Sequence, residues 1–285
     1  MIRGVAVFLA VAFGFSWLVW ELLSRAGHAP GSTDMAALYL LASFGPALGA
    51  TAARLATRQG FADAGLAPRL KAALPWYLFA WLWPLAAGAV ILLLAQVLSL
   101  AHVDWSLGSG LAALADARPD AGHLRDLAGS GVLVNAMLMA VPSALILFGE
   151  EFGWRGWLQR RLCAGRPGAA AVAVGVIWSL WHLPLNLRGY NFPHDPLLGQ
   201  IVFTANLIFL SVIFGWLRER SGTIWTVCLA HASTNTVGAT LVTLAIGGGQ
   251  DLFVAYLGAL GVVPLGGLAL WLAATGRLRR AGGGA

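Results

Sequence analysis

The sequence predicts an all-α polytopic membrane protein with about eight transmembrane helices and with both termini in the cytoplasm. The first observation is composition, because mean hydropathy is +0.76 and only 11% of the 285 residues are charged, whereas soluble domains carry about 25%. The second is a succession of apolar stretches long enough to cross a bilayer. The third is an uneven distribution of arginine between the loops. Together they identify lipid as the main solvent and predict one transmembrane domain over residues 1–285.

The apolar stretches define the expected spans. The first is interpreted as a retained span and not a signal peptide, because it is rich in Phe and Trp and no small-residue cleavage site follows it. Residues 58–74 are too polar to span and predict a short amphipathic piece at the inner interface. The eight expected spans are residues 4–24, 35–56, 75–100, 131–157, 168–187, 197–217, 222–246 and 251–274.

Basic residues supply the orientation. With the N-terminus inside, fourteen Lys and Arg residues fall in cytoplasmic segments and four fall outside, as the positive-inside rule requires. This scattered placement at span ends also argues against a nucleic-acid partner, so the lipid bilayer is the expected surrounding. The inside set is Arg3, Arg54, Arg58, Arg69, Lys71, Arg155, Arg160, Arg161, Arg166, Arg218, Arg220, Arg277, Arg279 and Arg280, and the outside set is Arg25, Arg118, Arg125 and Arg188.

Few strongly polar side chains lie inside the expected spans. Placing an ionisable group in the hydrocarbon core costs free energy, so each such residue in a span is a candidate functional residue. The acids are Glu150 and Glu151 in the fourth span, and the imidazoles are His182 in the fifth and His231 in the seventh. Asn235 follows one helical turn after His231. All can reach one layer between the midplane and the cytoplasmic face.

Helical spacing relates the acid pair to an arginine. Residues four apart share a helix face, so Arg155 can neutralise Glu151. Glu150 is rotated by about 100° and faces another direction. The same spacing pairs His231 with Asn235 in the seventh span.

In the fifth span Trp178 and His182 share a face, and Pro184 follows closely. Proline ends or kinks a helix and frees backbone groups, which tolerate a polar cavity better than lipid. Taken singly, each of these polar residues is explained by helix–helix hydrogen bonding or a structural ion pair. Their shared depth in three separate spans favours one polar cavity.

Such a set fits metal-free hydrolysis of a peptide bond. A carboxylate in an apolar cavity suits a general base, a neighbouring histidine can relay its proton, and a His with an Asn amide can donate to an oxyanion. No metal or other cofactor is favoured, since HExxH is absent. Zinc stays open as an alternative, with Glu150, His182 and His231 as its ligands from three helices. Ser233 is not favoured as a nucleophile, because no Gly-x-Ser-x-Gly elbow is present.

Three motifs in order resemble the CAAX-protease and bacteriocin-processing family of intramembrane endopeptidases, which includes abortive-infection proteins and Rce1-type enzymes. The family's EExxxR motif is matched by Glu150-Glu151-Phe-Gly-Trp-Arg155 and its HxxxN motif by His231-Ala-Ser-Thr-Asn235. Its FxxxH motif reads Trp178-Ser-Leu-Trp-His182, with Trp in place of Phe. The resemblance covers residues 145–240, which is the expected catalytic core.

The resemblance implies an eight-helix fold with a cavity that opens toward the cytoplasm. It implies that Glu150 and His182 activate water, that His231 and Asn235 form the oxyanion hole, and that Arg155 supports Glu151. The substrate is then a peptide or membrane protein, and Trp178 and Trp181 shape its pocket.

Three points of function stay open at this level. Arginine in place of lysine and abundant Ala and Gly are typical of GC-rich coding, which favours a bacterial cytoplasmic membrane and argues against prenylated substrates. Peptide maturation, bacteriocin immunity and cleavage of an unidentified membrane substrate are then the candidate roles. A proton-coupled transporter or a non-catalytic membrane scaffold remains the alternative, although no repeated halves are visible. The sequence says nothing of the oligomeric state.

Overall fold

A computed structural model describes residues 2–29, 36–117, 126–247 and 252–278, and every regular element in these ranges is helical. The first half of the chain forms α1 (Ile2–Arg25), α2 (Ala36–Ala42), α3 (Gly45–Ala56), η2 (Ala62–Ala64), α4 (Leu74–Val97), α5 (Gly108–Ala117) and α6 (Gly129–Gly153). The second half forms η4 (Trp154–Leu158), α7 (Pro167–Trp181), α8 (Leu183–Asn186), α9 (Pro196–Ser221), α10 (Trp225–Ser233), η5 (Thr234–Gly238), α11 (Ala239–Ile246), η6 (Ala259–Gly261) and α12 (Val262–Ala274).

Four of these segments are long and apolar enough to cross a bilayer, namely α1, α4, α6 with η4, and α9. The other four expected spans coincide with interrupted helices: α2–α3, α7–α8, α10–η5–α11 and the stretch that ends in α12. The all-α class of an integral membrane protein is therefore confirmed. The number of spans that cross and the side on which the termini lie stay predictions.

The interruptions have identifiable causes. Pro46 and Pro184 lie at the N-terminal turns of α3 and α8, where their fixed φ starts a new helix. The break between α10 and α11 is the π-helical turn η5, which follows His231 closely, and a second π-turn, η4, continues α6 after the Glu150-Glu151 pair. π-turns often mark functional positions in a helix.

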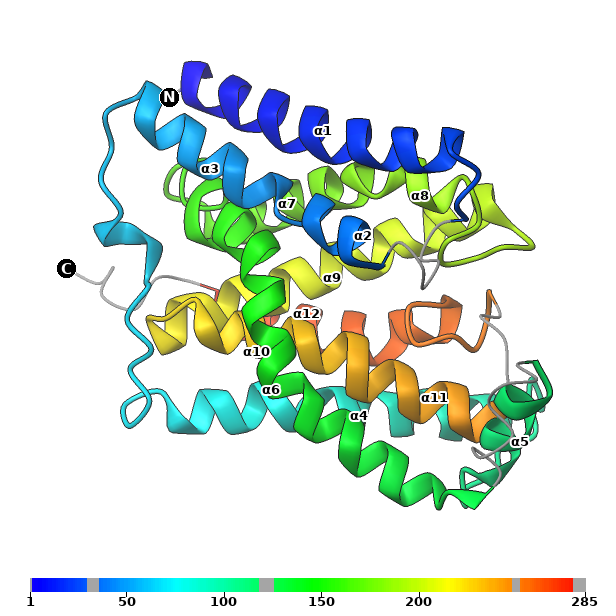
Figure 1. Cartoon of the computed structure of the whole chain (residues 1–285). Helices are drawn as coiled ribbons and strands as arrows, with labels where there is room; N and C mark the ends of the chain where they lie inside the picture. The colour runs from blue at the N-terminus through cyan, green and yellow to red at the C-terminus, as the bar shows by residue number, and fades with distance from the viewer. Residues whose placement is uncertain (1, 30–35, 118–125, 248–251, 279–285) are drawn as a thin grey trace.

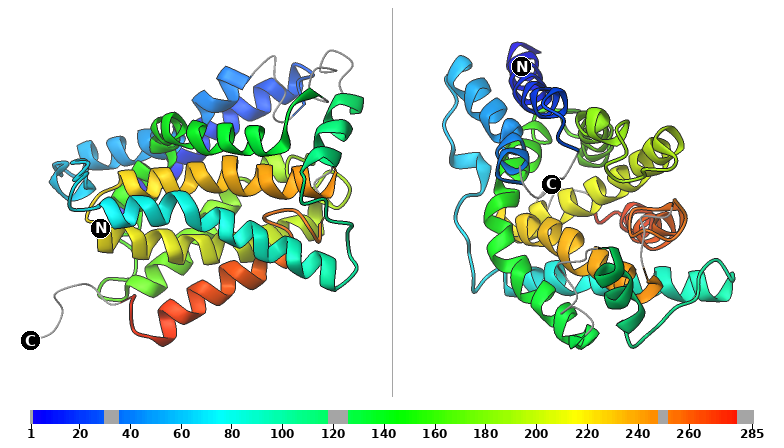
Figure 2. Two further views of the ribbon diagram at one scale, coloured as in Figure 1. Left: turned by 90° about the horizontal axis from the view of Figure 1, so that it is seen from below. Right: turned by 45° about the vertical axis from the view of Figure 1, so that its right-hand side comes forward.

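The helices pack in pairs that are distant in sequence. Helix α1 lies against α3, α7 against α9, and α10 against both α6 and α4. Figure 2 shows α12 beside α9 and α4 beside the α10–α11 rod. Glycines permit the closest approaches: Gly149 and Gly153 share one face of α6, and a Cβ on either would meet Phe44 or Pro46 at the start of α3.

Two ends of the molecule can be told apart. The arginine-rich end, at the left of Figure 1, holds the first turn of α1, the C-terminal ends of α3, η4, α9 and α12, and the segment around η2. The opposite end, which we call the arginine-poor end, holds α5, the α8–α9 loop and the segment that precedes η6. The start of α1 and the end of α12 thus lie at one end, as an even number of crossings requires.

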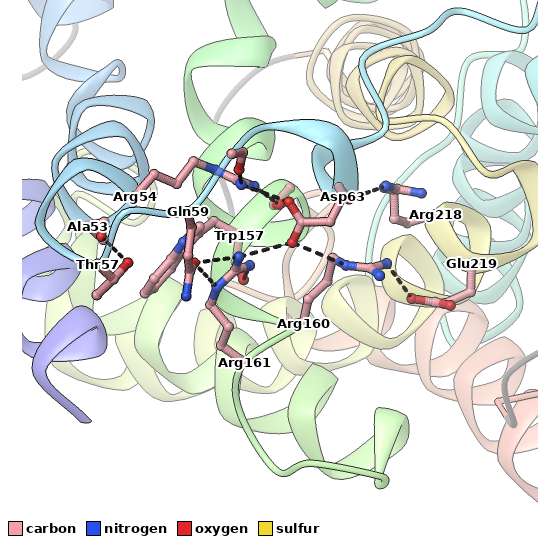
Figure 3. A network of polar contacts seen from close by, with 12 residues as sticks. Ala53, Arg54, Thr57, Gln59, Asp63, Trp157, Arg160, Arg161, Arg218 and Glu219 are labelled. Atoms are coloured by element: carbon pink, nitrogen blue, oxygen red, sulfur yellow. Dashed lines mark hydrogen bonds and ion pairs between the residues drawn. The ribbon is translucent and has the colours of Figure 1, made fainter. Parts of the chain in front are cut away.

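A polar network around Asp63 joins the elements at the arginine-rich end (Figure 3). Arg54 and Arg161 donate to the two carboxylate oxygens of Asp63 at 2.7 and 2.9 Å. Arg218 of α9 donates to its backbone carbonyl at 3.1 Å. Arg160 lies 3.9 Å from the same carboxylate and 3.5 Å from Glu219. We call these six residues, Arg54, Asp63, Arg160, Arg161, Arg218 and Glu219, the Asp63 network.

The Asp63 network fixes the end of the helix that carries the acid pair. Arg54 is fully buried, and it also donates to the carbonyl of Gly156 in η4 at 3.0 Å. The segment at 58–74 is therefore held by side chains, and of this stretch only Ala62–Ala64 forms a short 3-10 helix. Residues 58–73 form no α-helix, because Gly60, Gly65 and Pro68 interrupt the stretch, and its position at the inner interface stays a prediction.

Two further features differ from expectation. The segment 101–130, which lies between two expected spans, contains α5, and this helix packs on α11. Arg155 is buried in the bundle and leaves the charge bias at thirteen to four. Of the basic residues counted above, Arg118, Arg125, Arg279 and Arg280 lie outside the described residues.

Candidate active site

The acid pair lies in the last turn of α6, where the helix is buried on all sides. Glu151 is 0% exposed and Glu150 is 6% exposed. Adjacent residues on a helix point about 100° apart, and the two carboxylates accordingly have different partners. Glu151 faces Arg155 and α10, whereas Glu150 faces α7 and a cavity.

Glu151 binds an arginine and a histidine at once. Nη1 of Arg155 lies 2.8 and 3.0 Å from its two oxygens, and Nδ1 of His231 lies 2.9 Å from Oε1. The carboxylate accepts from Nδ1, so that nitrogen carries a proton and the tautomer of His231 is fixed. The remaining face of the guanidinium lies over the rings of Trp178 and Phe214, at 4.6 and 5.1 Å.

Glu150 accepts one hydrogen bond from a protein side chain. Nε1 of Trp178 donates to its Oε2 at 2.8 Å. Among the described residues, no direct hydrogen bond joins Glu150 to His182 or His231, although all three line one cavity. Oε1 of Glu150 therefore has no hydrogen-bond partner among the described residues and is available to a water molecule or a substrate.

His182 caps the end of α7 and is oriented by the backbone. Its Nδ1 lies 3.0 Å from the carbonyl oxygen of Trp178. A carbonyl can only accept, so Nδ1 carries the proton and Nε2 of the neutral ring keeps its lone pair. The ring is held edge-on by Trp181 and Phe203, with centroids at 4.7 and 5.2 Å.

A cavity of about 340 Å³ brings these groups together. Five of the eight residues singled out from the sequence line it: Glu150, Trp178, His182, His231 and Asn235. The other described lining residues are Tyr190, Asn191, Phe192, Phe203, Leu207, Leu210, Thr234, Ala239, Val242, Thr243, Ala255, Tyr256 and Leu257.

Three of the expected site residues lie outside the lining. Glu151 and Arg155 form the layer behind His231 and Trp178. Trp181, expected in the substrate pocket, packs against Trp154 and α1 instead, and its indole donates to the carbonyl of Ala12 at 3.3 Å. Trp181 therefore orients His182 from outside the cavity.

One wall of the cavity was not expected from the sequence. Residues 252–258, predicted as the start of the last span, form irregular turns before η6. Asn206, which is fully buried in α9, donates to the carbonyls of Leu257 and Gly258 at 2.7 and 3.0 Å. Non-helical backbone at membrane depth needs such partners. A buried Asn in the middle of a span was the available signal.

The placement of possible ligand atoms bears on whether the site could hold a metal ion. In the described part of the chain, no group of three or more His, Cys, Asp or Glu side chains is placed to hold an ion. Nδ1 of His231 and Oε2 of Glu150 are already engaged. The scheme proposed below therefore passes through no metal.

Comparison with known proteins agrees with this geometry. Residues 131–237 match the family model described as Rce1-like, type II CAAX prenyl endopeptidase. The match contains η4, the acid pair, both histidines and Asn235, and it ends within η5. No curated protein matches the chain. The resemblance stated on the motifs is confirmed: residues 131–237 of this integral membrane protein are similar to the Rce1-like type II CAAX prenyl endopeptidases.

Proposed function

We propose that the protein is an intramembrane endopeptidase that hydrolyses a peptide bond with a water molecule activated by Glu150 and His182. The observation that carries the proposal is a single cavity lined by Glu150, His182, His231 and Asn235, all from the region that matches a peptidase family. A free carboxylate oxygen and an oriented imidazole lone pair face a space large enough for a reacting group.

In this scheme Glu150 accepts a proton from the water that attacks the scissile carbonyl, and His182 holds that water through Nε2. The proton then passes to the departing amine, so that one water is consumed and two peptide ends are released. Trp178 keeps Glu150 oriented through the indole hydrogen bond.

The developing oxyanion needs donors, which Asn235 and His231 supply. Asn235 offers its amide N–H. His231 donates from Nε2 only as an imidazolium, since Nδ1 is committed to Glu151. Two carboxylates, Arg155 and one imidazolium sum to zero charge, which is the favourable count for a buried cluster. Arg155 and Glu151 thus act by positioning and balancing His231.

The experiment compares new peptide N-termini in membranes from cells that express the wild type or Glu150→Ala. Peptides that appear only with the wild type identify the substrate and the cleaved bond. If no cleavage depends on Glu150 while both proteins insert equally, the endopeptidase proposal fails. Activity that survives a strong chelator supports the metal-free scheme, and loss with rescue by zinc opposes it.

The alternative is a non-catalytic scaffold, an immunity protein or a proton-coupled transporter. Uptake of a substrate into proteoliposomes without hydrolysis would favour the transporter. Most of the described residues that line the cavity belong to the stretch that matches a peptidase family, which favours a protease over a transporter.

A further inference from the structure

A second polar network joins α7, α8 and α9 around the turn that carries His182, and the scheme above does not use it. Gln200 of α9 donates through Nε2 to Oγ and to the backbone carbonyl of Ser179 in α7, at 2.8 and 3.3 Å. Its Oε1 accepts from Nδ2 of Asn186 in α8 at 2.9 Å. Asn191, which lines the cavity, donates to Oδ1 of Asn186 at 2.7 Å. We call Ser179, Asn186, Asn191 and Gln200 the Gln200 network.

The hydrogen bonds of the helix backbone are incomplete at this turn. Pro184 has no N–H, so the regular pattern of α7 stops beside His182. The N–H of His182 donates to the carbonyl of Ser179 at 3.1 Å, and the N–H of Asn186 donates to the carbonyl of His182 at 3.0 Å. The same carbonyl of Ser179 and the side chain of Asn186 are the groups that Gln200 binds. One side chain of α9 therefore connects the two residues that hold His182 from either side.

The Gln200 network is largely buried, and its hydrogen bonds run in one direction. Ser179 and Asn186 are no more than 1% exposed. Each amide donates to the next residue: Asn191 to Asn186, Asn186 to Gln200, and Gln200 to Ser179. The carboxamides of Asn186 and Gln200 thus use both their oxygen and their nitrogen. Neither can rotate without leaving a polar atom unpaired, which costs free energy. The network therefore fixes α7, α8 and α9 relative to one another at this turn.

The same face of α9 also holds the imidazole ring. Phe203 and Thr204 follow Gln200 by three and four residues and so share its face of the helix. The ring of Phe203 is edge-on to that of His182, with centroids 5.2 Å apart. The hydroxyl of Thr204 lies 2.7 Å from Oγ of Ser179. The backbone of the turn and the ring that it carries are therefore both placed by one face of α9.

We propose that Gln200 is a positioning residue for catalysis, which holds the turn between α7 and α8 so that Nε2 of His182 faces the cavity. The inference rests on the proposed function, in which this nitrogen holds the attacking water. Gln200 is not among the described residues that line the cavity, so it acts through His182 and not by contact with a substrate. An amide that only joined two helices would contribute to stability and leave the orientation of the imidazole unchanged.

Helix α9 offers a matched control for Gln200→Leu, which removes the central amide of the network at similar side-chain volume. Ser211 is fully buried and donates through Oγ to the carbonyl of Ala171 in α7 at 2.7 Å. This bond joins the same two helices, but Ala171 lies about three turns before His182. Ser211→Ala therefore removes a bond between α7 and α9 without touching the turn. Gln200→Asn, too short by one methylene to keep both bonds, is expected to act in the same direction as Gln200→Leu and replaces it if that variant does not insert.

The first experiment observes the imidazole directly and needs no substrate. Full-length protein with ¹⁵N-labelled histidine is studied by NMR in detergent micelles, and the His182 signals are those that disappear in His182→Ala. The wild type is expected to show one neutral form protonated on Nδ1, since that nitrogen bonds to the carbonyl of Trp178. Gln200→Leu is expected to broaden or double these signals, and Ser211→Ala to leave them unchanged. Unchanged His182 signals in Gln200→Leu would overturn the proposal.

The second experiment uses the substrate that the Glu150→Ala comparison identifies. Gln200→Leu is expected to lower kcat by about tenfold or more and to change KM by less than about threefold, because a displaced catalytic group slows turnover more than it weakens binding. Ser211→Ala is expected to change kcat by less than about twofold. In a His182→Ala background, Gln200→Leu is expected to change the residual kcat by less than about twofold, because no imidazole is left to position.

A further loss of about tenfold in the His182→Ala background would overturn the proposal, because Gln200 would then act independently of the imidazole. An equal loss of kcat in Ser211→Ala and Gln200→Leu would also overturn it, since any bond between α7 and α9 would then have the same effect. Wild-type activity of His182→Ala would instead refute the hydrolysis scheme itself, on which the NMR comparison does not depend.

Discussion

The molecule contains two clusters of carboxylates and arginines, and they differ in every respect that matters for chemistry. The buried cluster pairs two glutamates with one arginine and two histidines beside a cavity. The Asp63 network surrounds one aspartate and one glutamate with four arginines at the arginine-rich end, with side-chain exposure of up to 35%. The first leaves acceptor atoms free, and the second satisfies its carboxylates with cations.

This difference shows how a candidate active site can be distinguished from a purely structural network of ion pairs. Ion pairs occur in both clusters, so an ion pair alone identifies neither. What distinguishes the buried cluster is the set of atoms that the protein does not use: Oε1 of Glu150 and Nε2 of both histidines. Polar atoms that no described residue binds, beside a cavity, point to a ligand or a reaction.

The largest expected contrast is in activity. Glu150→Gln or His182→Ala is expected to reduce kcat by about 10³-fold, because each removes a general-base function. Glu219→Gln, which weakens one pair of the Asp63 network, is expected to change kcat less than twofold. Cleavage assays on purified, correctly inserted protein measure both. An equal loss in the two variants would erase the distinction between the clusters.

The second contrast is in stability. Glu151→Gln leaves Arg155 fully buried without its counter-ion, which is expected to lower the free energy of unfolding by about 3–5 kcal/mol. Asp63→Asn at the partly exposed network is expected to lower it by about 1 kcal/mol. Thermal unfolding in detergent gives the comparison. A larger loss of stability in Asp63→Asn would show that the Asp63 network, and not the buried cluster, contributes more to the stability of the bundle.

The third prediction concerns the tryptophan that replaces phenylalanine in the second motif. Trp178→Phe removes the hydrogen bond to Glu150 and is expected to reduce kcat about tenfold with little change in KM, as for loss of a hydrogen bond to a charged acceptor. Trp181→Phe removes an indole that binds the α1 backbone and serves as the matched control. Equal kcat values for the two variants would argue against a positioning role of Trp178.

The smallest effect is a pH dependence confined to the Asp63 network. Burial raises the pKa of the Asp63 carboxyl, but hydrogen bonds and charges of Arg54 and Arg161 outweigh burial and hold that pKa below its ordinary value. A lowered folded-state pKa stabilises the protein above the ordinary value of about 4, and this contribution is lost as pH falls below it. Melting temperature measured from pH 6 to pH 3 should fall less steeply in Asp63→Asn than in the wild type.

The helices and most of the site residues could be predicted from the sequence, because both follow from local patterns. Apolar length predicts spans because lipid excludes unpaired backbone, and i, i+4 spacing predicted the Glu151–Arg155 pair. It did not find the partner of Glu151 in α10, nor the indole bond to Glu150, since both depend on how α6, α7 and α10 rotate against one another.

The irregular wall of the cavity could not be predicted from the sequence for a related reason. Residues 252–258 read as apolar and therefore as span, and their unwinding depends on the side chain of Asn206 in another helix. Helix α5 is likewise set by packing on α11. Contacts between segments, and not local composition, decided these elements.

The two π-turns set how the side chains on either side of them are rotated. A π-turn holds about one residue more than an α-turn, so η4 and η5 each place one extra residue in the turn compared with a regular helix. Removing one residue from Thr234–Gly238 would make α10 and α11 one regular α-helix. It would also rotate the side chains of α11 by about 100° relative to those of α10. The position of the α11 wall relative to His231 in α10 therefore depends on the number of residues between them as well as on which residues they are.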